Sequence, residues 1–238
     1  MEKFLKNKTA VVTGGTRGIG LAIARSLSAA GARVAICGRK PESLDEATKE
    51  LSADGDIFGM VADVSKDEDA ARFFAAVGAR FGGLDILVNN AGVGSFRPIQ
   101  ELSPHEWHQM VDINLNGVYY CCHYAIPLMR EKSGGYIIQI SSLAGKNAFA
   151  GGSAYNASKF GVNGFSEAIM QDLRYDNIRV SYVMPGSVDT DFGVRSARAS
   201  WKIAPEDVAQ VVIGLLQMPE RTLVSRIEMR PSKPAKNG

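Results

Sequence analysis

Hydrophobic positions along the chain follow two alternating periods. Short apolar runs of strand length recur between longer segments whose apolar residues have helical spacing. The predicted strands are residues 9–13, 33–37, 57–61, 84–89, 136–141, 179–184 and 222–229. Because strands that alternate with helices pair in parallel through crossover connections, the pattern predicts an α/β fold with a doubly wound parallel sheet of about seven strands, flanked by helices.

Helix ends are marked by capping residues. Residues 19–30 are predicted as a helix that ends at Gly31, a residue suited to the left-handed conformation. The segments 65–68 and 103–106 each have a serine followed three positions later by a glutamate, which is the spacing of a capping box. Further helices are expected over 107–129, 154–175 and 205–218.

The length and composition fit one globular domain. The chain has 238 residues, of which 45% are hydrophobic and 22% are charged, and no stretch resembles a linker. We therefore expect residues 1–238 to form a single domain, with a polar and mobile tail from about residue 231 to 238.

Charge and targeting signals argue against several function classes. The formal net charge of +2 provides no basic field for nucleic acid. The longest apolar runs have strand length, and residues 1–6 lead into the first strand without the apolar core of a signal peptide. We expect a cytoplasmic protein with no nucleic-acid partner and no membrane partner.

The cysteines do not indicate a disulfide framework or a metal site. Cys37, Cys121 and Cys122 are odd in number and lack C-x-x-C spacing, which argues against paired disulfides and against zinc. The histidines have no acidic or cysteine cluster at ligand spacing. We expect core cysteines, surface or interface histidines and no bound metal.

A glycine-rich turn follows the first predicted strand and precedes the first predicted helix. Residues 13–20 read Thr-Gly-Gly-Thr-Arg-Gly-Ile-Gly. Glycines let a backbone turn sharply and approach a pyrophosphate, whose negative charge is attracted by free N–H groups at a helix N-terminus. Strand, turn and helix in this order predict a phosphate-binding site, although an ordinary strand-to-helix loop has the same glycine spacing in some proteins.

Tyr155 and Lys159 lie four residues apart on a predicted helix, so their side chains project from the same face. A phenol with a pKa near ~10 exchanges protons poorly at neutral pH, and a nearby ammonium lowers that pKa by stabilising the phenolate. The pair is a candidate general acid or base, while the alternative is an ordinary solvated helix face.

Further motifs extend this picture in sequence order. Besides the glycine turn and the Tyr155 and Lys159 pair, they are Asn89-Asn90-Ala91-Gly92, Asn114, Ser142, Pro185-Gly186 and Thr190. With this pattern the chain, from residue 9 to about residue 229, resembles the short-chain dehydrogenase/reductase family. The resemblance implies a single Rossmann-like domain that both binds a dinucleotide and carries catalysis. It also implies an oxidoreductase that transfers a hydride between a nicotinamide cofactor and a carbonyl or secondary alcohol.

The resemblance assigns roles to four residues. Tyr155 would be the general acid that protonates the carbonyl oxygen, or the base in the reverse direction. Lys159 would lower the pKa of that tyrosine and hold the ribose hydroxyls of the cofactor. Ser142 would hydrogen-bond the reacting oxygen. Asn114 would interrupt the helix over 107–129 and hold a water that completes a proton relay behind the lysine.

The residues after the second predicted strand indicate which nicotinamide cofactor is used. An acidic residue there would bind the ribose 2′-hydroxyl of NAD(H), but this chain has Gly38-Arg39-Lys40. A guanidinium grips a phosphate, and Arg17 in the glycine turn supplies a second cation. We therefore expect NADP(H), the alternative being that Arg39 and Lys40 start a solvated loop. The expected cofactor-binding residues are Gly14, Thr16, Arg17, Gly18, Ile19, Gly20, Arg39, Asp63, Val64, Asn90, Ala91, Gly92, Tyr155, Lys159, Pro185, Gly186, Val188 and Thr190.

By the same resemblance, the substrate pocket would be lined by the segments 93–96, 143–149 and 191–201. These segments contain Phe96, Phe149, Phe192 and Trp201. Aromatic side chains favour an apolar pocket for a small-molecule carbonyl or alcohol. Arg195 and Arg198 are either solvated or placed to meet a carboxylate or an acidic carrier protein.

Two alternatives to a general carbonyl reductase stay open. One is a 3-oxoacyl-carrier-protein reductase, although residues 227–234 lack the paired glycines with which that enzyme usually ends. The other is a non-catalytic NADP(H)-binding regulatory protein on the same fold. In relatives the helices that correspond to 107–129 and 154–175 form a four-helix interface, so the resemblance also implies a homodimer or a homotetramer.

Overall fold

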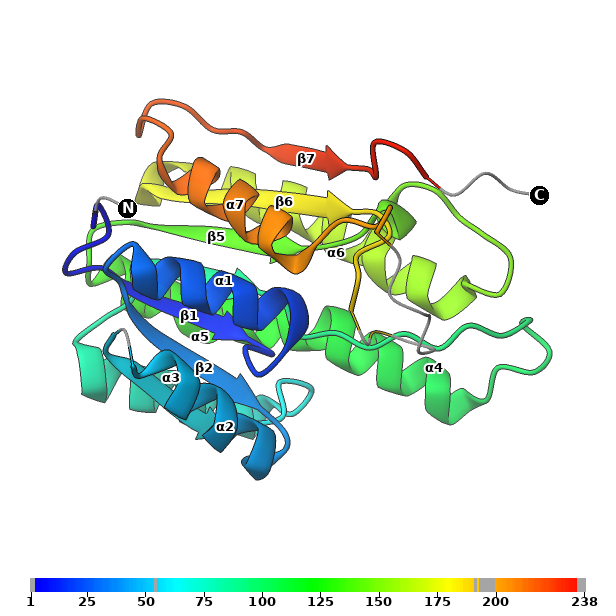
Figure 1. Cartoon of the computed structure of the whole chain (residues 1–238), viewed down its shortest axis with the longest axis horizontal. Coiled ribbons are helices and arrows are strands. Elements are labelled where there is room, and N and C mark those ends of the chain that lie inside the picture. Colours follow the sequence, from blue (N-terminus) through cyan, green and yellow to red (C-terminus); the bar gives the residue numbers. More distant parts are fainter. Residues whose placement is uncertain (1–2, 54, 191, 193–199, 235–238) are drawn as a thin grey trace.

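The computed structural model describes residues 3–53, 55–190, 192 and 200–234, and seven strands of this part form one sheet (Figure 1). The strands are β1 (Thr9–Thr13), β2 (Arg33–Gly38), β3 (Ile57–Val61), β4 (Ile86–Asn89), β5 (Gly135–Ile140), β6 (Ile178–Pro185) and β7 (Arg226–Met229). Their order is β3-β2-β1-β4-β5-β6-β7, and all neighbours pair in parallel. The predicted Rossmann-like, doubly wound parallel α/β sheet is confirmed.

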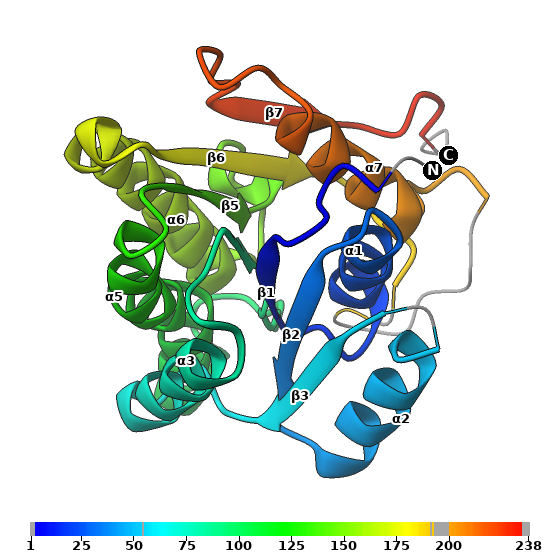
Figure 2. The same ribbon diagram turned by 90° about the vertical axis from the view of Figure 1, so that its left-hand side faces the viewer.

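Helices cover both faces of the sheet. They are α1 (Gly18–Ala29), α2 (Pro41–Leu51), α3 (Asp67–Phe81), α4 (Pro104–Val111), α5 (Gly117–Arg130), α6 (Ser153–Asp172) and α7 (Pro205–Leu216). Figure 2 shows α1, α2 and α7 on one side of the sheet and α3, α5 and α6 on the other. Within the described ranges, no helix combines the length and the apolar character needed to cross a membrane.

Each face of the sheet has its own hydrophobic core. Alternate residues of β1 point to opposite sides, so Ala10 and Val12 pack in the core under α1, α2 and α7, while Val11 packs in the core under α3, α5 and α6. The central strands β1 and β4 are buried on both faces, which is why they appear in the sequence as largely apolar runs. The three cysteines are free and buried.

Two of the predicted helix ends are confirmed. Gly31, just past α1, has a φ of +99°, in the left-handed region where glycine avoids the strain of a Cβ atom. Ser103 caps α4 in a reciprocal capping box, in which its hydroxyl accepts from the backbone N–H of Glu106 and the Glu106 carboxylate accepts from the backbone N–H of Ser103.

The capping box predicted at Ser65 is wrong. Helix α3 begins at Asp67, and the preceding Lys66 makes no side-chain cap. The hydroxyl of Ser65 instead donates to Asp63 Oδ1 over 2.7 Å, and the backbone N–H of Ser65 donates to the same oxygen over 3.1 Å. A carboxylate two residues away is a stronger and closer partner than the helix end, so the Ser65 hydroxyl bonds Asp63 instead of capping α3.

The long helix predicted over 107–129 is interrupted. Residues Asp112–Asn116 form a π-helical turn between α4 and α5. A π-helical turn inserts one extra residue into the helical hydrogen-bond ladder and redirects the side chains around it. Asn114 lies in this turn and is completely buried.

Candidate active site

A cavity of about 1610 Å³ opens at the carboxyl ends of the strands. It lies where β1 has β2 on one side and β4 on the other, so that the order in which successive strands are added to the parallel sheet reverses there. Ligands of open α/β sheets bind in the crevice at such a reversal. The segments that follow β1 through β6 all contribute to its lining.

The glycine turn between β1 and α1 forms one wall of the cavity. Gly14 and Gly18 have φ values of +63° and +54°, which favour glycine. A Cβ atom on Gly20 would lie 2.3 Å from the carbonyl oxygen of Gly14, so only glycine lets the helix pack this closely on the turn. Arg17 caps α1 without a side-chain hydrogen bond, and the first turn has no acidic residue. The backbone of this turn can therefore approach an anion and donate to it.

Thr13 joins the ends of β1 and β4, and the predicted set does not contain it. Its hydroxyl oxygen accepts from the backbone N–H groups of Asn90 and Ala91, at 3.0 and 3.1 Å. The side-chain amide of Asn90 donates back to the carbonyl oxygens of Thr13 and Gly14, at 3.0 and 3.2 Å. These four bonds hold the glycine turn against residues 90–91. A threonine at the end of an apolar run, directly before the glycine turn, was the available sequence signal.

Two exposed guanidinium groups lie at the same end of the cavity. Arg17 and Arg39 both line it, and within the described part of the chain neither guanidinium group forms an ion pair or a hydrogen bond. Asp63, also in the lining, has one carboxylate oxygen engaged by Ser65. The two guanidinium groups at this end of the cavity can bind an anionic group such as a phosphate, in addition to a neutral ribose hydroxyl.

Tyr155, Lys159 and Ser142 meet at the other end of the cavity. Tyr155 and Lys159 are buried on α6, and both line the cavity together with Ser142, which follows β5. Burial raises the pKa of the Tyr155 phenol, and a hydrogen bond with Ser142 opposes that rise. The expectation of a lowered tyrosine pKa is not met in this structure, because the burial of the phenol outweighs the stabilisation of its anion.

The ammonium group of Lys159 is held by the backbone rather than by an acid. Its Nζ donates to the carbonyl oxygen of Ile140 over 3.0 Å and lies 5.9 Å from the centre of the Tyr155 ring. Burial lowers the pKa of Lys159 to about 8. The lysine is therefore a buried cation that can lose its proton near physiological pH.

Asn114 fastens the cavity wall to α6. Its Oδ1 accepts from the backbone N–H of Val93 at 2.8 Å, and its Nδ2 donates to the carbonyl oxygen of Val93 at 2.9 Å and to Ser158 Oγ at 3.1 Å. The side chain lies behind the cavity and does not line it. The role predicted for it, holding a relay water, stays a prediction, whereas its bonds to Val93 and Ser158 are part of the observed fold.

Two further asparagines hold the loop that carries Ser142, and the predicted set lacks them. Asn156 donates to the carbonyl oxygens of Ala144 and Asn147, at 2.6 and 3.1 Å. Asn163 donates to the carbonyl oxygen of Gly145 at 3.0 Å. The two asparagines are two helical turns apart on α6, so they share a face, and that spacing was the sequence signal.

Two phenylalanine rings pack against the ring of Tyr155, and a third packs against one of them. The centre of the Tyr155 ring lies 5.5 Å from that of Phe96 and 5.7 Å from that of Phe192, and Phe96 lies 5.6 Å from Phe149. Their exposed fractions are 42% for Phe96, 46% for Phe149 and 40% for Phe192, so each ring retains apolar surface that can contact a ligand. Trp201 also lines the cavity. Asp191, Arg195 and Arg198 of the predicted pocket lie outside the described residues.

The structure brings almost all the catalytic and cofactor-binding residues predicted from the sequence to one cavity. The residues of that set that line it are Gly14, Thr16, Arg17, Gly18, Ile19, Arg39, Asp63, Val64, Asn90, Ala91, Gly92, Ser142, Tyr155, Lys159, Pro185, Gly186, Val188 and Thr190. Gly20 does not line the cavity, because it packs inside the turn against Gly14. The arrangement joins an anion-binding turn to a buried tyrosine and lysine and to a half-buried serine.

Comparison with known proteins gives one consistent result. The family model described as short chain dehydrogenase matches residues 8–200. The chain is 36% identical over 223 residues to a 3α-hydroxysteroid dehydrogenase of Mediterraneibacter gnavus, covering 92% of this chain and 88% of that protein. It is 33% identical over 228 residues to an uncharacterized oxidoreductase of Staphylococcus aureus, covering 95% of this chain and 98% of that protein.

Two solved structures are similar over nearly the whole chain. A metagenomic short-chain oxidoreductase in complex with NADP superposes with a TM-score of 0.86 at 39% identity, covering 97% of this chain and 99% of the other. An alcohol dehydrogenase from the archaeon Thermococcus sibiricus, complexed with 5-hydroxy-NADP, superposes with a TM-score of 0.89 at 29% identity and the same coverage.

Proposed function

Since the chain belongs to the short-chain dehydrogenase family, we propose that it transfers a hydride between NADP(H) and a carbonyl or secondary alcohol substrate. The observation that carries this proposal is the junction, within one cavity, of the glycine turn with Tyr155, Lys159 and Ser142. A protein that only bound a nucleotide would have no need for a buried tyrosine and lysine beside a serine hydroxyl that hydrogen-bonds the tyrosine.

The residues present fit a dinucleotide. Cβ atoms at Gly14 and Gly20 would collide with residues 14 and 90–91, so only glycine keeps the turn in this tight form. The first N–H groups of α1 have no partner within the helix, and they lie at the cavity end that also holds Arg17 and Arg39. Residues 90–92 and Pro185 to Thr190 line the length of the cavity between that end and Tyr155. The bound nicotinamide would supply or accept the hydride.

NADP(H) is favoured over NAD(H) by charge. Arg17 and Arg39 are exposed at the anion-binding end, and a 2′-phosphate is the group that distinguishes the two cofactors there. The similarity to two solved proteins in complex with NADP and 5-hydroxy-NADP supports the same assignment.

Tyr155 is proposed to move the proton. Because burial keeps the phenol protonated at neutral pH, its hydroxyl can donate to a carbonyl oxygen during reduction. The Ser142 hydroxyl can stabilise the negative charge that develops on that oxygen. The phenolate left behind would lie near the protonated Lys159 ammonium, which is 5.9 Å from the ring centre. Asn114 would hold the relay water that returns the proton.

The substrate class is proposed to be apolar. Phe96 and Phe192 present half-exposed rings beside Tyr155, and the half-exposed ring of Phe149 packs on Phe96. The relatives described as a 3α-hydroxysteroid dehydrogenase and an alcohol dehydrogenase support an apolar alcohol or ketone. We further propose a cytoplasmic, single-domain protein that assembles as a homodimer or homotetramer, which light scattering in solution would measure.

A panel of carbonyl substrates with NADPH tests the proposed function. The panel contains aliphatic, aromatic and steroid ketones and a 3-oxoacyl thioester, and turnover is followed by the absorbance of the reduced nicotinamide. Turnover of the apolar ketones is the expected result, and preference for the thioester would favour a 3-oxoacyl-carrier-protein reductase instead. Tight NADPH binding without turnover of any member would favour a regulatory protein.

A further inference from the structure

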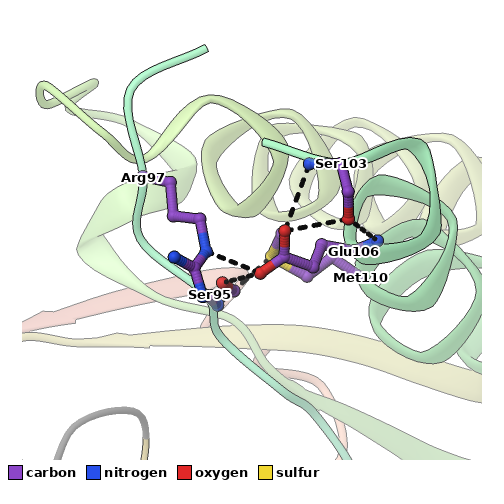
Figure 3. A network of polar contacts seen from close by, with 5 residues as sticks. All are labelled: Ser95, Arg97, Ser103, Glu106 and Met110. Carbon is purple, nitrogen blue, oxygen red and sulfur yellow. Dashed lines mark hydrogen bonds and ion pairs between the residues drawn. The ribbon is translucent and has the colours of Figure 1, made fainter. Parts of the chain in front are cut away.

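The carboxylate of Glu106 in the first turn of α4 joins two parts of the chain (Figure 3). One oxygen accepts from Arg97 Nε at 2.7 Å and from Ser95 Oγ at 3.0 Å. The other accepts from the backbone N–H and the hydroxyl of Ser103, at 3.1 and 2.9 Å. A helix cap needs only the second pair of bonds, so the bonds to Ser95 and Arg97 call for a separate explanation.

Glu106 binds Ser95 and Arg97 on the loop of residues 93–97, and these two residues flank Phe96. The loop is fixed at its start by Asn114, which bonds both backbone groups of Val93. It is fixed at its end by the backbone N–H of Arg97, which donates to the carbonyl oxygen of Gly151 over 2.8 Å. Between these points, side-chain bonds to Ser95 and Arg97 restrain the backbone on either side of Phe96.

Phe96 packs against the ring of Tyr155 and lines the same cavity. Its ring meets the Tyr155 ring edge to face at 5.5 Å and also contacts the ring of Phe149. A Cβ atom on Gly94 would lie 3.0 Å from the Phe96 ring and 2.7 Å from the Phe192 ring, so the loop backbone passes closely beneath both rings. A shift of this loop would therefore move the apolar surface that faces the substrate.

Glu106 has no role as a proton donor in the working range. Its hydrogen bond with Arg97, followed by those with Ser103 and Ser95, lowers its pKa to about 2. The carboxylate stays ionised at neutral pH, and it does not line the cavity. Its effect on a reaction must pass through the residues that it holds.

We propose that Glu106 is a positioning residue for substrate selectivity, which acts by anchoring Ser95 and Arg97 so that the Phe96 ring is held beside Tyr155 as a contact surface for the apolar flank of the substrate. The proposal rests on the function proposed above. It adds a residue outside the cavity to those that determine which ketone is accepted.

The first test compares two ketones in the Glu106→Gln variant. Acetophenone has a ring that can lie on Phe96, and 2-butanone is too small to cover it. We expect kcat/KM for acetophenone relative to 2-butanone to fall by roughly tenfold, mainly through KM, because a misplaced apolar surface weakens binding of the larger group. A ratio that stays within about twofold of the wild-type value would overturn the proposal.

A double-mutant cycle tests whether the effect passes through Phe96. In a Phe96→Ala background, Glu106→Gln should change the ketone ratio by less than about twofold, because the surface that Glu106 positions is already gone. Independent, additive effects of the two substitutions would show that Glu106 does not act through Phe96.

Ser103→Ala is the matched control for helix capping. It removes a cap worth about 1 kcal/mol of stability but leaves Ser95 and Arg97 in place. The melting temperature should fall while the ketone ratio stays at the wild-type value. A loss of selectivity equal to that of Glu106→Gln would mean that helix stability, and not loop anchoring, sets the ratio.

A readout without turnover separates this proposal from the proposed function. The protein is labelled with 4-fluorophenylalanine, and the fluorine resonance of Phe96 is assigned by its loss in Phe96→Leu. Glu106→Gln should shift or broaden this resonance, and Ser103→Ala should not. An unchanged Phe96 resonance in Glu106→Gln overturns the positioning role, whereas absence of any ketone turnover by the wild type overturns only the proposed function.

Discussion

Lys159 Nζ lies 5.9 Å from the centre of the Tyr155 ring, and its hydrogen bond goes to the carbonyl oxygen of Ile140. Both side chains are buried on α6, and no carboxylate of the described residues pairs with this ammonium. A buried cation without an acidic partner costs stability, so its presence beside a tyrosine indicates a functional demand. This relationship leads to the first two predictions.

Tyr155→Phe is expected to abolish most turnover and spare cofactor binding. General acid catalysis contributes roughly 10²–10⁴ to a rate, and the substitution removes only the hydroxyl. Steady-state assays should show a loss of that size in kcat, while fluorescence titration should give an NADPH Kd within about twofold of the wild type. Tyr175→Phe, at a side chain that is 92% exposed, is the matched control and should keep full activity. Equal loss in both variants would contradict the role of Tyr155.

Lys159→Met is expected to stabilise the fold while removing activity. The folded pKa of Lys159 is about 8, below the ordinary lysine value of 10.5, so the folded state binds fewer protons than the unfolded state between these pH values. The stability of the wild type should therefore rise with pH across this window, and below it the burial penalty is fully present. The gain from Lys159→Met should be about 2 kcal/mol at pH ~7, because relief of the burial penalty exceeds the lost hydrogen bond to Ile140.

Urea unfolding at several pH values measures this difference. The advantage of Lys159→Met over the wild type should shrink as pH rises from about 8 toward 10.5. Lys49→Met, at an exposed position of α2, is the control and should show no such trend. A constant difference at all pH values would mean that Lys159 is not a buried cation in the folded protein.

Arg39→Ala is expected to weaken NADPH binding selectively. A charge-assisted hydrogen bond is worth about 1.5–3 kcal/mol, so the Kd for NADPH should rise by roughly 10- to 100-fold while that for NADH stays within about twofold. Arg17→Ala should act in the same direction because both guanidinium groups line the same end of the cavity. Titrations with both cofactors measure the effect, and equal weakening of NADPH and NADH would exclude contact with a 2′-phosphate.

Gly20→Ala is expected to disrupt the glycine turn. The added Cβ would lie 2.3 Å from the carbonyl oxygen of Gly14 and 2.4 Å from the Asn90 amide, so backbone must shift. NADPH affinity and the melting temperature should both fall. Gly214→Ala in α7 is the matched control, because among the described residues no atom outside the local helix backbone lies within 4 Å of the added Cβ, and it should stabilise the helix by about 0.5–1 kcal/mol. Unchanged NADPH binding by Gly20→Ala would contradict the close packing of the turn.

Local sequence patterns predicted the secondary structure and much of the candidate site. Continuous apolar runs marked strands buried on both faces, and the parallel order placed the segments after those strands at one edge of the sheet. The glycine turn and the spacing of Tyr155 and Lys159 could be recognised in the sequence because each depends on neighbours within a few residues. The prediction at Ser65 was wrong because a nearby carboxylate competed for the same hydroxyl.

Contacts between segments that are distant in the sequence could be identified only from the tertiary structure. Glu106 could be read as a helix cap, but its bonds to Ser95 and Arg97 depend on where the loop after β4 returns. The direction of the Tyr155 pKa shift depends on burial, which the spacing to Lys159 does not express. Periodicity and motif spacing encode local geometry, whereas burial and long-range hydrogen bonds depend on the packing of the whole chain, and for that reason the chemistry was readable in the sequence and its surroundings were not.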